Sequence, residues 1–184
     1  MIKDLKETGA LLNGHFLLSS GLHSEAYVQC ASLLKYPGFA EKYGSALAEK
    51  VKKYKPEIVV GPALGGVIAA YEVARSLGLP GIFAERKNGI MMLRRNFEIK
   101  PGQKVLVVED VVTTGGSVKE VIEVIKKNKG ELVAVASIID RSAGDAEFGV
   151  PFESLVDINF DVYDSGRCPL CEKGTKAVKP GSRE

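Results

Sequence analysis

The sequence has 184 residues, which is the length of one ordinary domain with a small appendage and too short for two full folds. Its 25 Lys and Arg against 23 Asp and Glu leave a formal net charge of +2, so the composition gives no general case for a nucleic-acid partner. Hydrophobic residues make up 45% and charged residues 26%, values close to the globular average that exclude a wholly disordered or fibrous protein.

The first predicted helix covers residues 39–54, where apolar side chains repeat every four positions. Pro37 is suitably placed near its start, because the fixed backbone angle of proline fits the first turn of a helix. The Glu-Ile-Val-Val run at 57–60 predicts a buried strand. A second helix is expected at 66–77, closed by Gly78.

The same alternation continues in the second half of the chain. Continuous apolar runs at 104–108 and 132–139 predict two further buried strands, with a helix at 117–128 between them that is closed by Gly130. Strands that alternate with helices of this length imply βαβ units with right-handed crossovers. The sequence therefore predicts an α/β fold with a mainly parallel central sheet flanked by helices.

Residues 83–95 interrupt this rhythm. The segment has Asn88-Gly89 at its centre, which is the strongest short signal for a β-hairpin, and it is rich in cationic side chains. A polar, cationic hairpin between two core strands is a candidate for a mobile flap.

The two ends of the chain, residues 1–35 and about 152–184, do not follow the βαβ pattern. We expect them to form a small cap on a single domain that spans residues 1–184. Three cysteines are a sparse, odd set, as a reducing compartment allows. The start lacks a signal-peptide core, and no apolar run approaches the roughly 18 residues of a membrane span. We expect a cytoplasmic protein with no membrane partner.

Residues 109–117 carry the most informative pattern of the chain. Glu109 and Asp110 come directly after a predicted core strand, at the edge where open α/β sheets bind ligands. Two adjacent acids repel each other, so burying both requires a partner such as ribose hydroxyls or a bound cation. The Thr-Thr-Gly-Gly-Ser run at 113–117 then opens a helix, where turned N–H groups, hydroxyls and the helix dipole favour an anion. The loop is suited to a sugar and its phosphate, although an ordinary helix-capping turn is the alternative.

Residues 107–117, Val-Val-Glu-Asp-Val-Val-Thr-Thr-Gly-Gly-Ser, resemble the phosphoribosyl pyrophosphate (PRPP) signature of the type I phosphoribosyltransferases. Within that superfamily the chain resembles the orotate phosphoribosyltransferases across nearly its whole length, through residues 16–24, 61–66, 85–87 and 140–141. The resemblance implies an enzyme of pyrimidine biosynthesis. Such an enzyme transfers the phosphoribosyl group of PRPP to orotate and gives orotidine 5′-monophosphate and pyrophosphate.

The resemblance also assigns a PRPP site. It places Glu109 and Asp110 on the ribose hydroxyls and, together with Lys87, makes them the catalytic residues. The remaining residues assigned to PRPP are Arg86, Gly65, Gly66, Val111, Val112, Thr113, Thr114, Gly115, Gly116 and Ser117. Arg86 and Lys87 match a basic pair that clamps pyrophosphate, as a guanidinium fork and an ammonium are suited to do. Without the resemblance, the alternative interpretation is that Arg86 and Lys87 lie on a solvated surface and that Gly65 and Gly66 belong to a tight turn.

For the base, the resemblance assigns orotate to Arg141, Thr113, Ser20 and Gly21. A lone Asp-Arg after a strand would otherwise be a surface ion pair. Mg²⁺ is implied as a cofactor that is bound mainly through substrate oxygens. The implied assembly is a homodimer in which the flap is shared between subunits.

The flap differs from the pattern of many relatives, because it has no His and no second Lys soon after Arg86-Lys87. This leaves Lys87, Arg94 and Arg95 as candidates for the cation that acts in catalysis. The alternative for Arg94 and Arg95 is that both only solvate the hairpin.

Cys168 and Cys171 form one Cys-x-x-Cys motif, which has half of the ligands of a structural zinc site. Cys30, His15 and His23 are the other soft candidates, at irregular spacing. A structural turn is the first interpretation of the motif. A zinc shared between two subunits and a redox pair are the alternatives.

Two rival functions share parts of this pattern. A purine phosphoribosyltransferase would keep the fold and change the base. A PRPP-sensing regulator would bind nucleic acid through an added surface, but the near-neutral charge and the lack of an added helix-turn-helix segment argue against it.

Overall fold

The computed structural model describes residues 1–18 and 20–180, so that Ser19, inside the segment 16–24, lies outside the described residues. The chain divides into two compact units. The larger unit is Tyr36–Ile158, and the smaller unit combines Met1–Lys35 with Asn159–Glu184.

The larger unit is built on a six-stranded sheet with the strand order β5-β4-β3-β6-β7-β8. Its strands are β3 (Ile58–Pro62), β4 (Gly81–Lys87), β5 (Ile90–Leu93), β6 (Lys104–Val112), β7 (Glu131–Asp140) and β8 (Phe152–Asp157). All neighbouring strands run parallel except β4 and β5, which form an antiparallel hairpin. The predicted α/β fold with a mainly parallel sheet is confirmed.

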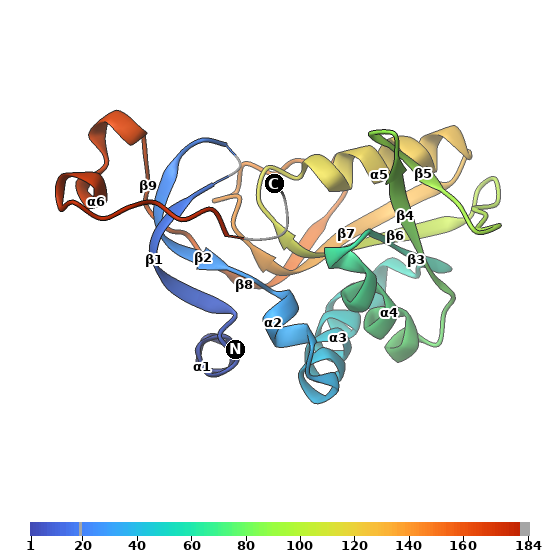
Figure 1. The fold of residues 1–184 in the computed structure, drawn as a ribbon. Coiled ribbons are helices and arrows are strands. Elements are labelled where there is room, and N and C mark those ends of the chain that lie inside the picture. Colours follow the sequence, from blue (N-terminus) through green and yellow to red (C-terminus); the bar gives the residue numbers. More distant parts are fainter. Residues whose placement is uncertain (19, 181–184) are drawn as a thin grey trace. The chain divides into compact units, whose positions relative to one another are not determined.

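Three long helices cover this sheet: α3 (Pro37–Val51), α4 (Gly65–Leu77) and α5 (Gly116–Lys127). Figure 1 shows α3 and α4 on one face and α5 on the other. Because both faces are covered, the central strands are buried along their length. Val59 and Val60 of β3 and residues 105–108 of β6 are completely enclosed.

The predicted helices are confirmed, and their ends follow local chemistry. Pro37 occupies the first turn of α3, and Gly78 ends α4 in a left-handed conformation at φ 68°. The end of α5 differs from the prediction, because the left-handed residue after it is Lys129, at φ 58°. Position 130 requires glycine because any Cβ there would collide with the Ile99 side chain, at a distance of 2.7 Å.

The hairpin at 83–95 is also confirmed. Asn88 and Gly89 both have positive φ, 52° and 80°, as the tight turn between two strands with right-handed twist requires. Lys87 and Ile90 face each other across this turn as the last pair of β4 and β5.

The structure differs from the prediction in two strands, β6 and β8. β6 continues through Glu109 and Asp110 to Val112, four residues beyond the predicted strand, because β7 remains paired to it as far as Val112 and Asp140. Residues 152–157, which we expected in the cap, form β8 at the edge of the main sheet. Their side chains are only half-buried, so they lack the continuous apolar run by which the other parallel strands are identified.

The smaller unit contains a three-stranded antiparallel sheet with the order β1-β2-β9. Its elements are α1 (Ile2–Glu7), β1 (Leu11–Leu17), β2 (His23–Val28), α2 (Ala31–Leu34), β9 (Val162–Tyr163), η2 (Ser165–Arg167) and α6 (Pro169–Glu172). A bridge between Phe16 and Val178 ties the last described residues to β1. Across the described part of the chain, no helix combines the length and the apolar character that a bilayer crossing requires.

Candidate active site

The order of the strands fixes where a ligand is expected. The chain moves from β3 to β4 in one direction across the sheet, and then returns to β6 on the other side of β3 and continues to β7 and β8. In open sheets of this kind, ligands bind beyond the carboxyl ends of the strands where the order reverses. That point lies between the ends of β3 and β6, which carry Gly65-Gly66 and Glu109-Asp110.

The structure brings the glycines and the acids into direct contact. A Cβ on Gly65 would lie 2.6 Å from Oδ1 of Asp110, and a Cβ on Gly66 would lie 3.1 Å from Oε1 of Glu109 and 2.9 Å from the carbonyl oxygen of Val108. Any side chain at these positions would collide with the acids or with the backbone of β6. The backbone of the glycine loop therefore packs directly against the acid pair.

Glu109 is buried and Asp110 is half-buried. Burial raises the pKa of Glu109 well above its usual range, and the adjacent charge of Asp110 raises it further. Burial also raises the pKa of Asp110, against the effect of its hydrogen bonds with Glu109 and with backbone amides. Two adjacent carboxylates, one buried and one half-buried, are suited to accept hydrogen bonds from the hydroxyls of a sugar or to lie beside a cation.

The phosphate-type loop, residues 113–117, follows the acid pair along the chain. Thr113 and Thr114 leave the end of β6, and Gly115 takes a left-handed conformation at φ 72° before α5 begins at Gly116. The ring of Phe148 lies where a Cβ of Gly115 would be, 2.8 Å away, so conformation and space both require glycine. No side chain among the described residues caps α5. Its first N–H groups are therefore available to bind an anion.

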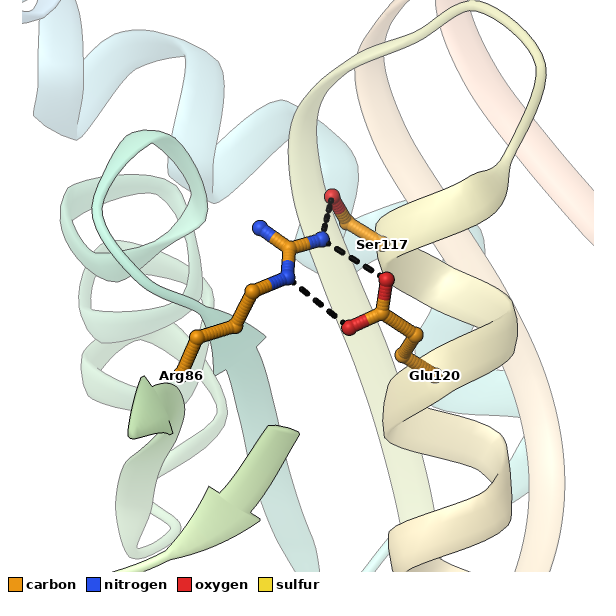
Figure 2. Close-up of polar contacts among 3 residues, drawn as sticks. All are labelled: Arg86, Ser117 and Glu120. Carbon is orange, nitrogen blue, oxygen red and sulfur yellow. Dashed lines mark hydrogen bonds and ion pairs between the residues drawn. The ribbon is translucent and has the colours of Figure 1, made fainter. Parts of the chain in front are cut away.

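Arg86 reaches from the end of β4 to the start of α5 (Figure 2). Its Nε and Nη2 donate to the two carboxylate oxygens of Glu120, each at 2.9 Å, and Nη2 also donates to the hydroxyl of Ser117 at 3.2 Å. The contact with Ser117 places the guanidinium directly beside the phosphate-type loop. Glu120 was not among the predicted site residues, because an acid one turn into a helix has no distinguishing pattern in the sequence.

The three candidate flap cations lie in different surroundings. Lys87 is exposed at the end of β4, beside the hairpin turn. Arg94 and Arg95 both pair with Glu85, with nitrogen–oxygen distances of 3.4 and 3.2 Å. Arg95 also covers the ring of Phe83. These contacts hold both arginines at the base of the hairpin.

Arg141 lies next to β6, the strand that carries Glu109 and Asp110. Its backbone N–H donates to the carbonyl oxygen of Val112 at 2.8 Å, so it stands next to Thr113 at the carboxyl edge of the sheet. Asp140 turns back and accepts a hydrogen bond from the N–H of Ser142 at 2.7 Å. The structure thus brings together Thr113 and Arg141, two of the four residues predicted to contact the base.

The other two, Ser20 and Gly21, belong to the smaller unit. They form the turn between β1 and β2, where Gly21 has φ 84° and donates its N–H to the carbonyl oxygen of Leu18 at 2.9 Å. The Ser20 hydroxyl accepts a long hydrogen bond from the N–H of Leu22, at 3.5 Å.

Comparison with known proteins identifies the class of this chain. A family model described as a phosphoribosyl transferase domain matches residues 29–150, which include the glycine loop, the acid pair and the first turns of α5. The fold is that of a phosphoribosyl transferase.

Curated proteins that are similar to this chain have a narrower class in common. The orotate phosphoribosyltransferase of Thermotoga maritima is 60% identical over 184 residues, covering 100% of this chain and 98% of that protein. The enzyme of the same name from Caldanaerobacter subterraneus is 56% identical over 171 residues, 93% of this chain and 90% of the relative. The chain belongs to the orotate phosphoribosyltransferase family.

Solved structures agree. Orotate phosphoribosyltransferase from Aeropyrum pernix superposes with a TM-score of 0.68 at 30% identity, covering 83% of this chain and 93% of that one. The Mycobacterium tuberculosis enzyme in complex with PRPP superposes with a TM-score of 0.62 at 25% identity, covering 71% of this chain and 80% of that one.

Proposed function

We propose that this protein transfers the phosphoribosyl group of PRPP to orotate, giving orotidine 5′-monophosphate and pyrophosphate for pyrimidine biosynthesis. The observation that carries the proposal is the acid pair Glu109 and Asp110, which lies against Gly65-Gly66 and leads directly into the loop before α5. Full-length identity of up to 60% with proteins named orotate phosphoribosyltransferase supports the choice of base.

Each part of PRPP has a suited group in the larger unit. Glu109 and Asp110 accept hydrogen bonds from the ribose hydroxyls, and the loop from Val111 to Ser117 takes the 5′-phosphate on its amides and hydroxyls. The backbone at Gly65-Gly66 and the cations Arg86 and Lys87 hold the pyrophosphate, which needs several positive partners when it leaves.

For the base, Arg141 offers a guanidinium to the orotate carboxylate, and Thr113 offers a further polar group. The displacement at the anomeric carbon passes through a cationic, oxocarbenium-like sugar, beside which two carboxylates are favourable. No covalent protein nucleophile is needed, because a ring nitrogen of orotate is the nucleophile. The β4–β5 hairpin would close over the sugar and exclude water.

Magnesium fits the residues of this pocket. Glu109 and Asp110 supply the carboxylate oxygens that Mg²⁺ prefers, and a cation beside them would offset the charge of Asp110 that raises the pKa of Glu109. When bound, mainly through PRPP oxygens, Mg²⁺ would neutralise charge on the leaving pyrophosphate.

We further propose a cytoplasmic homodimer. Its support is a row of apolar side chains left exposed along one face of α4: Leu64, Ile68 and Tyr71, exposed by 87%, 44% and 61%. A row of this kind is typical of a protein–protein contact surface. The three cysteines are free of disulfide bonds, as in a reducing compartment.

The test is a substrate comparison with PRPP and Mg²⁺. We expect loss of the ultraviolet absorbance of orotate together with release of pyrophosphate, and no turnover of hypoxanthine or adenine. Turnover of a purine without turnover of orotate would overturn the choice of base. Arg141→Ala should raise the KM for orotate far more than the KM for PRPP, and an equal rise in both would remove Arg141 from base recognition.

A further inference from the structure

A second cluster of reactive side chains lies in the smaller unit, apart from the residues assigned to PRPP. His15 projects from β1 and His23 from the first position of β2, and Cys168 and Cys171 flank the first turn of α6. Figure 1 shows β1, β2 and α6 of this unit. All four residues belong to one chain, although up to 156 positions separate them in the sequence.

The spacing of their ligand atoms matches a metal site. Sγ of Cys168 lies 3.6 Å from Nε2 of His15, and Sγ of Cys171 lies 3.8 Å from the same nitrogen and 3.3 Å from Nδ1 of His23. All four ligand atoms lie within 4.8 Å of one another. A tetrahedral zinc, with bonds of about 2.0–2.1 Å to nitrogen and 2.3 Å to sulfur, holds its ligands about 3.3–3.8 Å apart.

The two ring nitrogens are closer, at 2.8 Å, which is the length of a hydrogen bond. In this arrangement one imidazole donates to the other. A small rotation of the rings would open the nitrogen pair to the ligand spacing of a tetrahedron.

Residues around the cluster fix the orientation of His15. The hydroxyl of Thr175 donates its one proton to the carbonyl oxygen of Leu170 at 2.7 Å. Nδ1 of His15 lies 2.8 Å from that hydroxyl oxygen and 3.1 Å from the Thr175 carbonyl oxygen, so Nδ1 carries the proton and donates it. Nε2 is then unprotonated and faces the other three candidate ligand atoms, which is the arrangement that a metal-binding histidine takes.

We propose that His15, His23, Cys168 and Cys171 bind one Zn²⁺ in a closed, structural Cys₂His₂ site. Two soft thiolates with two imidazoles favour zinc over magnesium or calcium. Four protein ligands leave no open position, so the ion has no catalytic role. Because one chain supplies all four ligands, the site does not need a second subunit.

A redox pair explains less of the geometry. A disulfide between Cys168 and Cys171 would occupy both sulfurs. It would not explain why two buried imidazoles lie beside them. His15, His23 and Cys168 are all buried, whereas Cys171 is exposed at the edge of the cluster.

The site would join the two ends of the chain that make up the smaller unit. It ties α6 to the β1–β2 hairpin, and a cross-link between distant positions removes much of the freedom of the unfolded chain. His15 and His23 also flank the turn with Ser20 and Gly21, so the ion would hold the base of that turn.

The experiment begins with the wild-type protein, purified under reducing conditions and loaded with Zn²⁺ or Co²⁺. We expect one metal ion per chain by elemental analysis. With Co²⁺ we expect thiolate charge-transfer absorption and the intense visible bands of a tetrahedral centre. Metal-free protein, or a Co²⁺ spectrum without thiolate bands, would overturn the proposal, and so would a Cys168–Cys171 disulfide found by mass spectrometry in metal-free protein purified without reductant.

The variants Cys171→Ala and Cys30→Ala form a matched pair, because Cys30 lies in the same unit outside the cluster. We expect Cys171→Ala to lose stoichiometric metal and the thermal stabilisation that Zn²⁺ gives, and Cys30→Ala to retain both. Equal metal content in the two variants would contradict the ligand assignment. The wild-type Co²⁺ spectrum remains decisive even if a variant does not fold.

Discussion

At the scale of single residues, the carboxylate pair sets the pH behaviour of the pocket. A buried acid with a raised pKa holds its proton in the folded state after the unfolded chain has released it. The folded state is therefore favoured at low pH, and this stability is lost as the pH rises from about 4.3 through the folded pKa of Glu109. The loss amounts to about 1.4 kcal/mol for each unit by which that pKa is raised.

We expect Glu109→Gln to raise the Tm of the ligand-free protein at neutral pH, because a neutral amide carries no buried charge. Each kcal/mol corresponds to roughly 2–4 °C in a chain of this size. The gain should shrink as the pH approaches 4 and Glu109 of the wild type becomes neutral. Thermal melts from pH 4 to 8 measure this, with the exposed Glu131→Gln as a control that should not change the Tm. A gain independent of pH would mean that Glu109 is not charged in the folded protein.

At the scale of elements, the contact between β4 and α5 links the basic pair to the phosphate-type loop. Arg86 and Glu120 are both partly exposed, so their ion pair contributes at most about 1 kcal/mol. In the proposed site, Arg86 would therefore leave Glu120 for pyrophosphate at little cost. Glu120 would then compete with the substrate for the guanidinium, and it adds a negative charge close to the start of α5.

We expect Glu120→Gln to lower the KM for PRPP by up to about fivefold, the equivalent of 1 kcal/mol. Glu123→Gln is the matched control, since Glu123 lies on the same helix and pairs only with Lys126 among the partners recorded for it. Steady-state kinetics at low ionic strength measure both. A raised KM for PRPP in Glu120→Gln would show that the acid positions Arg86 rather than competing for it.

The elements predicted from the sequence are those specified by local signals. Gly78 and the Asn88-Gly89 turn have the conformations that their residue types favour, and both were predicted. The extension of β6 through Glu109 and Asp110 was not predicted, because it depends on pairing with β7 and not on an apolar run. Gly130 was predicted as a helix end for its conformation, but it is required by its contact with Ile99, which lies far away in sequence.

At the scale of the whole molecule, the same distinction separates the two sites. Glu109 to Ser117 is one continuous segment, so the proposed PRPP pocket could be predicted from residue order alone. The cluster of His15, His23, Cys168 and Cys171 has no such continuity, because its halves meet only when the smaller unit folds. The sequence supplied the Cys-x-x-Cys motif and named His15, His23 and Cys30 as further candidates, but their irregular spacing could not show which of them meet it.

The proposed homodimer gives the last prediction, which concerns a flap that works across subunits. The hairpin presents Lys87 and the 65% exposed Ile90 at its tip, where a partner subunit could receive them. If Lys87 acts in the pocket of the partner, then Lys87→Ala and Asp110→Asn damage different halves of one composite site. Each variant alone should be nearly inactive.

Mixing the two variants under conditions of subunit exchange should restore about a quarter of the wild-type activity, because half of the dimers are mixed and each has one intact site. Glu109→Gln mixed with Asp110→Asn is the control: both changes lie in the same pocket, so no intact site can form. Exchange is verified by native mass spectrometry. Exchanged dimers without restored activity would assign Lys87 to the pocket of its own subunit, and a monomer by sedimentation would exclude sharing altogether.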